Sequence, residues 1–305
     1  MFTIQKYMFD IIDTHQHLWN LDQLNLPWVN GVPELNRSYK FSDYLKAAEN
    51  SGVTRTIYME VDTHPDHKQK EIDDMTLHCQ ADSDIMLGMV VSADPGKPGF
   101  AKFLDANSGN PFIKGVRQVL HNPEQAPKSC LTPEFVQGLR ALGKRNLLFD
   151  ICIRPAELHD AVELCRQVPE TTFVLDHCGN ADPYVVNGQR KIGSSSSDST
   201  FLHSKESWQN GIFKLGELKN VYCKISGIVA RAETDWNAET LAPTVNTCLE
   251  AFGENRVVFG GDWPVCTLGA SLSQWIAALK EIVSTRPTVV QEKLFSINAE
   301  RLYQL

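Results

Sequence analysis

The chain has 305 residues, of which 42% are hydrophobic and 22% charged, and its formal net charge is −8. This composition is typical of a globular protein. The negative charge argues against nucleic acids and anionic membranes as partners, because both select clustered lysine and arginine. No apolar run approaches a membrane span, the N-terminus lacks a secretory signal, and the eight cysteines form no CxxC pair. These features favour a cytoplasmic protein.

Eight short apolar runs, rich in β-branched residues, follow one another along the chain. They are nearly continuous rather than alternating, which is typical of parallel strands buried on both faces. The expected strands lie at 11–17, 55–60, 85–93, 113–120, 146–153, 171–178, 221–228 and 256–262.

Amphipathic, helix-like stretches separate these runs. Segment 41–52 ends at a glycine, and segment 155–168 carries an apolar stripe at helical spacing. In segment 132–145, Thr132 precedes Pro133, an arrangement that favours the first turn of a helix. We therefore expect helices over these three segments.

The alternation of eight strands with helices predicts an α/β fold, a single (β/α)8 TIM-type barrel over residues 1–305. An open, doubly wound sheet is the structural alternative, and it is disfavoured because no glycine-rich phosphate loop follows any strand. One polar, serine-rich segment, 179–208, follows the sixth strand. We expect it to be a long loop on the C-terminal face of the barrel, either a lid or a flexible insertion.

Polar residues occur where the expected strands end, and barrel active sites lie at this end. His15 and His17 end the first strand, with a spacing that points both imidazoles to one side. Arg117 lies on strand four, His177 ends strand six and Asp262 ends strand eight. A carboxylate after an apolar strand is costly unless it is paired or functional. These five residues are the predicted catalytic group.

Some of these residues also have a structural interpretation. Arg117 is consistent with an ion pair to Glu60 or Asp150, and Lys224 on strand seven is as consistent with a structural role as with a functional one. The other histidines outside the site are interpreted as surface or hydrogen-bonded structural residues: His64, His67, His78, His159 and His203.

The order of these motifs resembles that of the amidohydrolase superfamily, with HxH on strand one, His on strand six and Asp on strand eight. The finer motifs DTHQHLWN, LPW, GVRQVL, FDICIRP, DHCGN, KISG and FGGDWPV occur in this order. Together they resemble the branch of sugar-acid lactonases, which includes L-fuconolactonase and L-rhamnonolactonase, and the related pyrone-dicarboxylate lactonase. The resemblance covers about residues 11–300.

The resemblance implies one possible metal site, formed by His15, His17, His177 and Asp262, for a single zinc or manganese ion. Binuclear members of the superfamily have a bridging Lys or Glu on strand four and a His on strand five. This chain has Arg117 at the first position and no histidine in NLLFDICI. We therefore expect no binuclear site. The four groups can also work without any ion, so no cofactor is expected to be required.

The expected reaction is hydrolysis of a sugar-derived lactone, a small-molecule substrate, to the aldonic acid. Asp262 would accept a proton from the attacking water and pass one to the leaving ring oxygen. Arg117, His17 and His177 would stabilise the negative charge that develops on the carbonyl oxygen. His15 would orient its neighbour or the substrate. The residues expected to contact the sugar are Trp19, Trp28, Glu60, His121 and Lys224.

Three other functions are alternatives. A carboxylated pyrone lactone would require several arginines, and only Arg117 and Arg154 lie at expected strand ends. A metal-dependent decarboxylase of an aromatic or semialdehyde acid would ordinarily use the missing strand-five histidine. A non-catalytic binding barrel has no need of both the histidine pair and Asp262.

Overall fold

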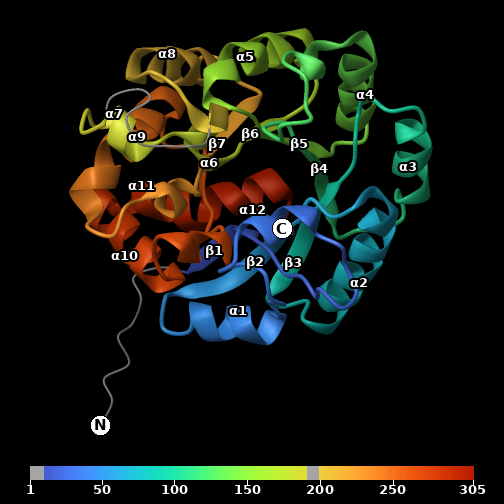
Figure 1. The fold of residues 1–305 in the computed structure, drawn as a ribbon, viewed down its shortest axis with the longest axis horizontal. Helices are drawn as coiled ribbons and strands as arrows, with labels where there is room; N and C mark the ends of the chain where they lie inside the picture. Colours follow the sequence, from blue (N-terminus) through green and yellow to red (C-terminus); the bar gives the residue numbers. More distant parts are fainter. Residues whose placement is uncertain (1–9, 191–198) are drawn as a thin grey trace.

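The computed structural model describes residues 10–190 and 199–305. In this part of the chain, eight parallel strands form one sheet in sequence order, surrounded by helices (Figure 1), which confirms the predicted (β/α)8 barrel. The strands are β1 (Ile11–Gln16), β2 (Val53–Met59), β3 (Met86–Ser92), β4 (Ile113–Val119), β5 (Leu148–Cys152), β6 (Phe173–Leu175), β7 (Val221–Ile225) and β8 (Val257–Phe259).

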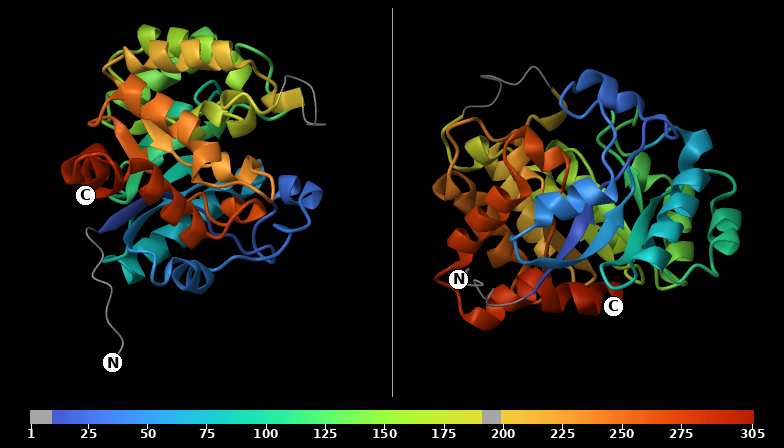
Figure 2. Two further views of the ribbon diagram at one scale, coloured as in Figure 1. Left: turned by 90° about the vertical axis from the view of Figure 1, so that its left-hand side faces the viewer. Right: turned by 90° about the horizontal axis from the view of Figure 1, so that it is seen from below.

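Helices form the outer layer of the barrel, as the two further views in Figure 2 also show. They are α1 (Phe41–Ala48), α2 (Lys68–Ala81), α3 (Phe100–Ala106), α4 (Pro133–Gly143), α5 (Leu158–Gln167), α6 (His177–Asn180), α7 (Pro183–Val186), α8 (Lys205–Gly216), α9 (Ala238–Phe252), α10 (Leu272–Val283), α11 (Thr288–Glu292) and α12 (Asn298–Tyr303). Short turns are η1 (Pro27–Gly31), η2 (Pro65–His67), η3 (Ser129–Leu131), η4 (Pro155–Glu157), η5 (Ser199–Phe201), η6 (Ile228–Arg231), η7 (Val265–Leu268) and the π-helical η8 (Lys293–Ile297).

The helix predictions are confirmed in position, and one of them is too long. Helix α4 begins at Pro133, and the Thr132 hydroxyl accepts the backbone N–H of Phe135 (3.4 Å) as an N-cap. Helix α1 ends at Ala48 rather than at 52. Positive φ angles at residues 50 and 52 turn the chain into β2 before the predicted end of the helix.

The expected loop 179–208 is not free of regular structure. Its described part contains α7, η5 and the beginning of α8. Residues 191–198, which include most of the serine run, lie outside the described residues.

The first and last strands meet at a seam that closes the barrel. The Asp262 N–H donates to the His15 carbonyl (2.6 Å), and the His17 N–H donates to the Trp263 carbonyl (2.7 Å). A parallel bridge joins Gln16 to Trp263. Residues almost 250 positions apart are thereby fixed side by side at the ends of their strands.

An apolar cluster fills the barrel near the N-terminal ends of the strands. Ile12, Val174 and Val258 pack there against Leu302 and Tyr303 of α12, so α12 covers this end of the barrel. The eight cysteines, all within the described residues, are buried and free. In the described part of the chain, no helix has the length and apolar character to cross a membrane.

Candidate active site

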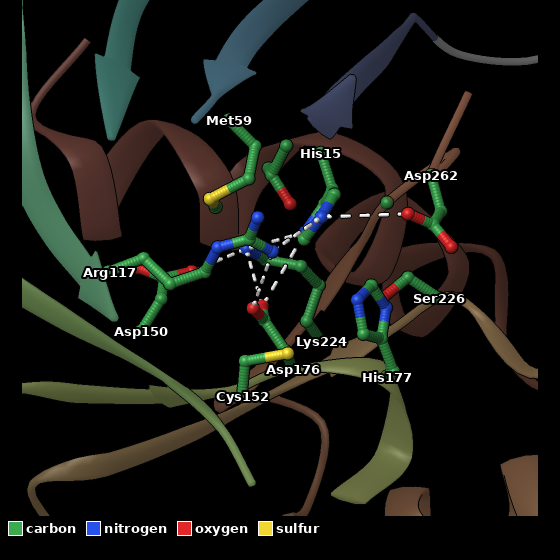
Figure 3. A network of polar contacts seen from close by, with 12 residues as sticks. His15, Met59, Arg117, Asp150, Cys152, Asp176, His177, Lys224, Ser226 and Asp262 are labelled. Atoms are coloured by element: carbon green, nitrogen blue, oxygen red, sulfur yellow. Dashed lines mark hydrogen bonds and ion pairs between the residues drawn. The ribbon is translucent and has the colours of Figure 1, made fainter. Parts of the chain in front are cut away.

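A layer of paired charges fills the middle of the barrel (Figure 3). The ammonium Nζ of Lys224 lies 2.5 Å from Asp150 Oδ1 and 3.0 Å from Asp176 Oδ1, with all three side chains fully buried. Arg117 Nε lies 2.5 Å from Glu60 Oε1, and Arg117 Nη1 lies 3.5 Å from Asp176 Oδ2. We call these five residues the charged layer. Their mutual pairing offsets part of the cost of removing the charges from water.

His15 of β1 and His17, just after the strand, lie above the charged layer and face one another. Their Nε2 atoms are 3.2 Å apart, which confirms that both imidazoles point to the same side of the strand. His17 Nδ1 lies 2.9 Å from the Met59 carbonyl and 3.0 Å from the Glu60 carbonyl, both at the end of β2. These carbonyls fix the orientation of the His17 ring.

Asp262 and His177 complete the group from the other side of the barrel. Asp262 Oδ1 lies 3.4 Å from His17 Nε2 and 3.6 Å from His15 Nε2. The His177 ring centroid lies 4.6 Å from that of His15, and the Ser226 hydroxyl contacts His177 Nδ1 at 2.9 Å. The structure therefore brings the three histidines and the carboxylate into one place.

Asp262 and His177 both have unusual backbone conformations. Asp262 has a φ of 56°, and His177 has a φ of 55° at the start of a short left-handed turn in α6. Such conformations cost about 1–2 kcal/mol per residue and persist where neighbouring packing determines them. A side chain at Gly227 would place its Cβ 2.3 Å from His177 Nδ1. The absence of that Cβ gives the imidazole its space.

The electrostatics favour a carboxylate beside neutral imidazoles. Burial alone would raise the pKa of Asp262, but His177 and the other histidines outweigh burial and hold this pKa below its usual range. Burial lowers the pKa of His15 and that of His177. At neutral pH the carboxylate is therefore ionised while His15 and His177 carry no charge.

A cavity of about 300 Å³ opens at this end of the barrel. Of the predicted residues, it is lined by His17, Trp28, Arg117, His121, His177 and Asp262. The other predicted residue of the catalytic group, His15, is fully buried beneath them.

Three residues expected to contact the sugar lie elsewhere. Glu60 and Lys224 have no exposed surface and belong to the charged layer. Trp19 is buried behind Trp28, with its ring edge-on to that of Trp28 and its Nε1 donating to the Arg37 carbonyl (2.6 Å). Glu60 and Lys224 are separated from the cavity by their depth in the barrel, which the sequence does not record, and Trp19 lines a different pocket.

The cavity wall also contains residues that the sequence analysis did not select. Arg231 of η6 donates to Asn180 Oδ1 (2.9 Å), and its guanidinium stacks 3.5 Å from the Phe201 ring centroid. The Phe201 ring in turn lies 5.2 Å from His121. Asp176, which belongs to the charged layer and not to the cavity wall, was also missed. It is adjacent to His177 in the DHCGN motif, and this adjacency was the available signal.

The donor set suits a single divalent ion in type and spacing. His15, His17 and Asp262 offer ligand atoms within 4.8 Å of one another, and His15, Asp176 and His177 form a second such group. Imidazole nitrogens and carboxylate oxygens are ordinary zinc ligands.

Comparison with known proteins places the chain in a family. A family model described as amidohydrolase matches residues 12–305. The chain belongs to this amidohydrolase family. The amidohydrolase is 24% identical to an L-fucono-1,5-lactonase of Burkholderia multivorans, over 96% of each chain. It is 20% identical to an L-rhamnono-gamma-lactonase of Scheffersomyces stipitis, over 97% of this chain and 99% of the relative.

A solved amidohydrolase structure from Burkholderia multivorans, with bound zinc, has the same fold. The TM-score is 0.82 at 22% identity, over 97% of this chain and 99% of that one.

Proposed function

We propose that this amidohydrolase opens a sugar-derived lactone to its aldonic acid. The observation that carries the proposal is the Asp262 carboxylate, held within 3.6 Å of two imidazoles where a cavity of about 300 Å³ meets the ends of the strands. The relatives named as sugar lactonases support this class of substrate.

Asp262 serves as the general base. Because it is ionised at neutral pH, it accepts a proton from water as the water oxygen bonds to the lactone carbonyl carbon. The tetrahedral intermediate then breaks the bond to the ring oxygen, and protonated Asp262 returns the proton to that oxygen. The ring supplies a tethered leaving group, so no further nucleophile is required.

Arg117 and His177 stabilise the carbonyl oxygen as it becomes negative. Both line the cavity, and the Ser226 hydroxyl at His177 Nδ1 leaves the opposite ring nitrogen to face the substrate. His17 was predicted to share this task. Its Nδ1 contacts backbone carbonyls and its Nε2 faces His15, so we assign it to holding Asp262.

No metal is required in this proposal. His15, His17 and Asp262 are the residues that would hold zinc, which when bound acts as a Lewis acid on a carbonyl oxygen.

One observation favours a second substrate class, a lactone that carries carboxylates. Arg231 lines the cavity together with Arg117, whereas Arg154 does not, so two guanidinium groups are available to carboxylates of a ligand. A carboxylated pyrone lactone is therefore the second candidate.

Acid release from a panel of lactones tests both candidates. The panel contains 1,4- and 1,5-aldonolactones and a carboxylated pyrone lactone, assayed with a pH indicator in the presence and absence of a chelator. We expect turnover of several aldonolactones that is insensitive to the chelator and lost in Asp262→Asn. Turnover of the pyrone alone would select the second candidate, and no turnover of any lactone would contradict the proposal.

A further inference from the structure

Three cysteine sulfurs converge between the barrel wall and helix α9. Cys178 lies in the turn of α6 just after β6, Cys223 lies on β7 and Cys248 lies on α9. These three elements pack against one another (Figure 1). The three Sγ atoms lie within 4.8 Å of one another, and the three residues have no exposed surface. We call this group the thiol cluster.

The backbone explains why the sulfurs meet on the outer side of the sheet. The Lys224 side chain points into the barrel, where it contacts Asp150. Because side chains alternate along a strand, the neighbouring Cys223 points the other way, toward the helices. Cys178 has a φ of 52° and approaches from the end of β6, with its Sγ 3.8 Å from the Lys224 carbonyl. Cys223 Sγ lies 4.0 Å from the same carbonyl. Both contacts use the thiol hydrogen, so the sulfur lone pairs remain available.

Burial alone does not bring cysteines together in this chain. All eight cysteines are buried. Within the described residues, the five outside the thiol cluster belong to no group of three or more histidine, cysteine or acidic donors. Cys79 on α2, for example, is as fully buried as Cys248 on α9. A buried cysteine that acts only as a small apolar side chain does not need other sulfurs beside it.

The donor atoms indicate which ion the thiol cluster suits. Sulfur ligands select soft ions, monovalent copper among them. Structural zinc sites take four ligands, whereas this group offers three within the described residues. Monovalent copper is stable with three sulfurs in a plane. Bonds of about 2.3 Å, as in zinc–thiolate sites, would set the sulfurs of such a plane about 4 Å apart. The side chains would therefore close by at most about 1 Å.

We propose that the thiol cluster binds one monovalent copper ion, at a site separate from the histidines and Asp262 of the cavity. Each sulfur that binds gives up its proton, and the positive ion offsets part of the resulting charge. The surrounding apolar core excludes water and dissolved thiols from the ion. Copper would join three elements that are distant in the sequence. It therefore stabilises the folded protein, as any ligand specific to the native state does.

X-ray absorption of the wild-type protein tests the ligand set. The intact, reduced protein is incubated without oxygen with one equivalent of monovalent copper, supplied as its bathocuproine disulfonate complex. We expect one copper per chain to move from the chelator to the protein. Its spectrum should show three sulfur neighbours at about 2.3 Å. Copper that stays on the chelator, or that has nitrogen or oxygen neighbours in the protein, would overturn the proposal.

Cysteine variants test the location. Cys248→Ala and Cys79→Ala are a matched pair, because both replace a fully buried cysteine on a helix. The affinity of each for monovalent copper is measured by competition with the same chelator. Loss of a ligand should cost more than the 10–100-fold typical of losing an outer partner of a ligand. We therefore expect at least that loss in Cys248→Ala and none in Cys79→Ala. Wild-type affinity in Cys248→Ala would contradict the proposal.

Thermal unfolding keeps the test valid if Cys248→Ala is too unstable for the competition assay. Copper should raise the Tm of wild type and of Cys79→Ala, because it binds the folded state. The same addition should leave the Tm of Cys223→Ser unchanged. An equal rise in all three proteins would assign the copper to other residues and overturn the proposal.

Discussion

The barrel contains two polar regions that differ in how their charges are satisfied. In the charged layer, Lys224, Asp150 and Asp176 have no exposed surface, and each charge faces an opposite one. In the cavity above, Asp262 faces the imidazoles of His17 and His15 and an opening rather than a lysine or arginine. Both regions consist of polar residues on or just after strands. Pairing, rather than polarity, separates residues that support the barrel from residues available to a substrate.

The largest effect is expected at Asp262, the cavity's only carboxylate in contact with the histidine pair within the described residues. Asp262→Asn removes the general base, so kcat should fall by about 10²–10⁴, while the circular dichroism spectrum stays that of wild type. Asp62→Asn, at the cavity wall, is the control and should keep kcat within a few-fold. Steady-state kinetics on an aldonolactone measure both, and near-normal activity of Asp262→Asn would exclude it as the base.

Arg117 belongs to both the charged layer and the cavity, so its replacement should affect both stability and catalysis. Arg117→Met removes a donor from the cavity, which lowers kcat by about 10²–10³. It also leaves Glu60 buried and unpaired, which costs about 3–5 kcal/mol of stability. Kinetics and urea unfolding separate the two effects. A loss of stability without a loss of kcat would assign Arg117 to the charged layer alone.

Gly227→Ala tests whether the position of His177 depends on missing side-chain volume. The new Cβ would lie 2.3 Å from His177 Nδ1, so we expect kcat to fall by about tenfold or more, in line with the sensitivity of catalysis to small displacements. Gly188→Ala is the matched control. It also has a positive φ, of 84°, but its Cβ would meet no atom within 4 Å. An equal fall in kcat in the two variants would show that backbone strain, and not the displaced imidazole, causes the loss of activity.

Trp28 and Trp19 form a pair in which only one ring lines the cavity. Trp28→Phe should raise KM by a few-fold with little change in kcat, because the smaller ring offers less contact to a sugar and loses the bond to the Val61 carbonyl. Trp19→Phe should leave KM unchanged and lower the free energy of unfolding instead. The reverse result would show that Trp19 contacts the substrate.

The last prediction concerns the pH dependence of stability at Glu71, away from the cavity. Burial raises the pKa of Glu71 to about 8, and its Oε2 has no hydrogen-bond partner within the described residues. The unfolded chain releases this proton near pH 4.5 and the folded chain near 8, so stability falls as pH rises through this window.

Glu71→Gln removes this proton exchange. Between pH 5 and 8, the free energy of unfolding of wild type should fall by on the order of 3 kcal/mol more than that of the variant. The comparison with the variant is needed because Asp13, whose pKa burial raises to about 6, contributes a loss of the same sign. Parallel pH profiles would contradict a protonated Glu71.

The sequence was sufficient for the number and order of the strands, the histidine pair and the convergence of His15, His17, His177 and Asp262 on one place. The sixth and eighth strands were predicted too long, since they end at Leu175 and Phe259, before His177 and Asp262.

The sequence was insufficient to show how deep inside the barrel each polar side chain lies. Glu60 and Lys224 satisfy the same pattern as Arg117, since each is polar and lies at a strand end. Only Arg117 also reaches the cavity, because depth depends on how neighbouring strands are offset, and no local pattern records that offset.

The left-handed turn explains another miss. Regular alternation would place Asp176 and His177 on opposite sides of a strand. The positive φ at His177 ends the alternation at that residue, so both side chains come close to His15. The sequence gives no sign of a left-handed turn at this histidine.

The seam between β1 and β8 runs through the catalytic centre, since the Asp262 backbone is bonded to that of His15. Neither half of the chain holds a usable fragment of the site. Catalysis therefore becomes possible only when the ring is complete. During refolding, helical content could therefore return before any activity does. The rate at which turnover recovers would then measure how fast β1 and β8 join.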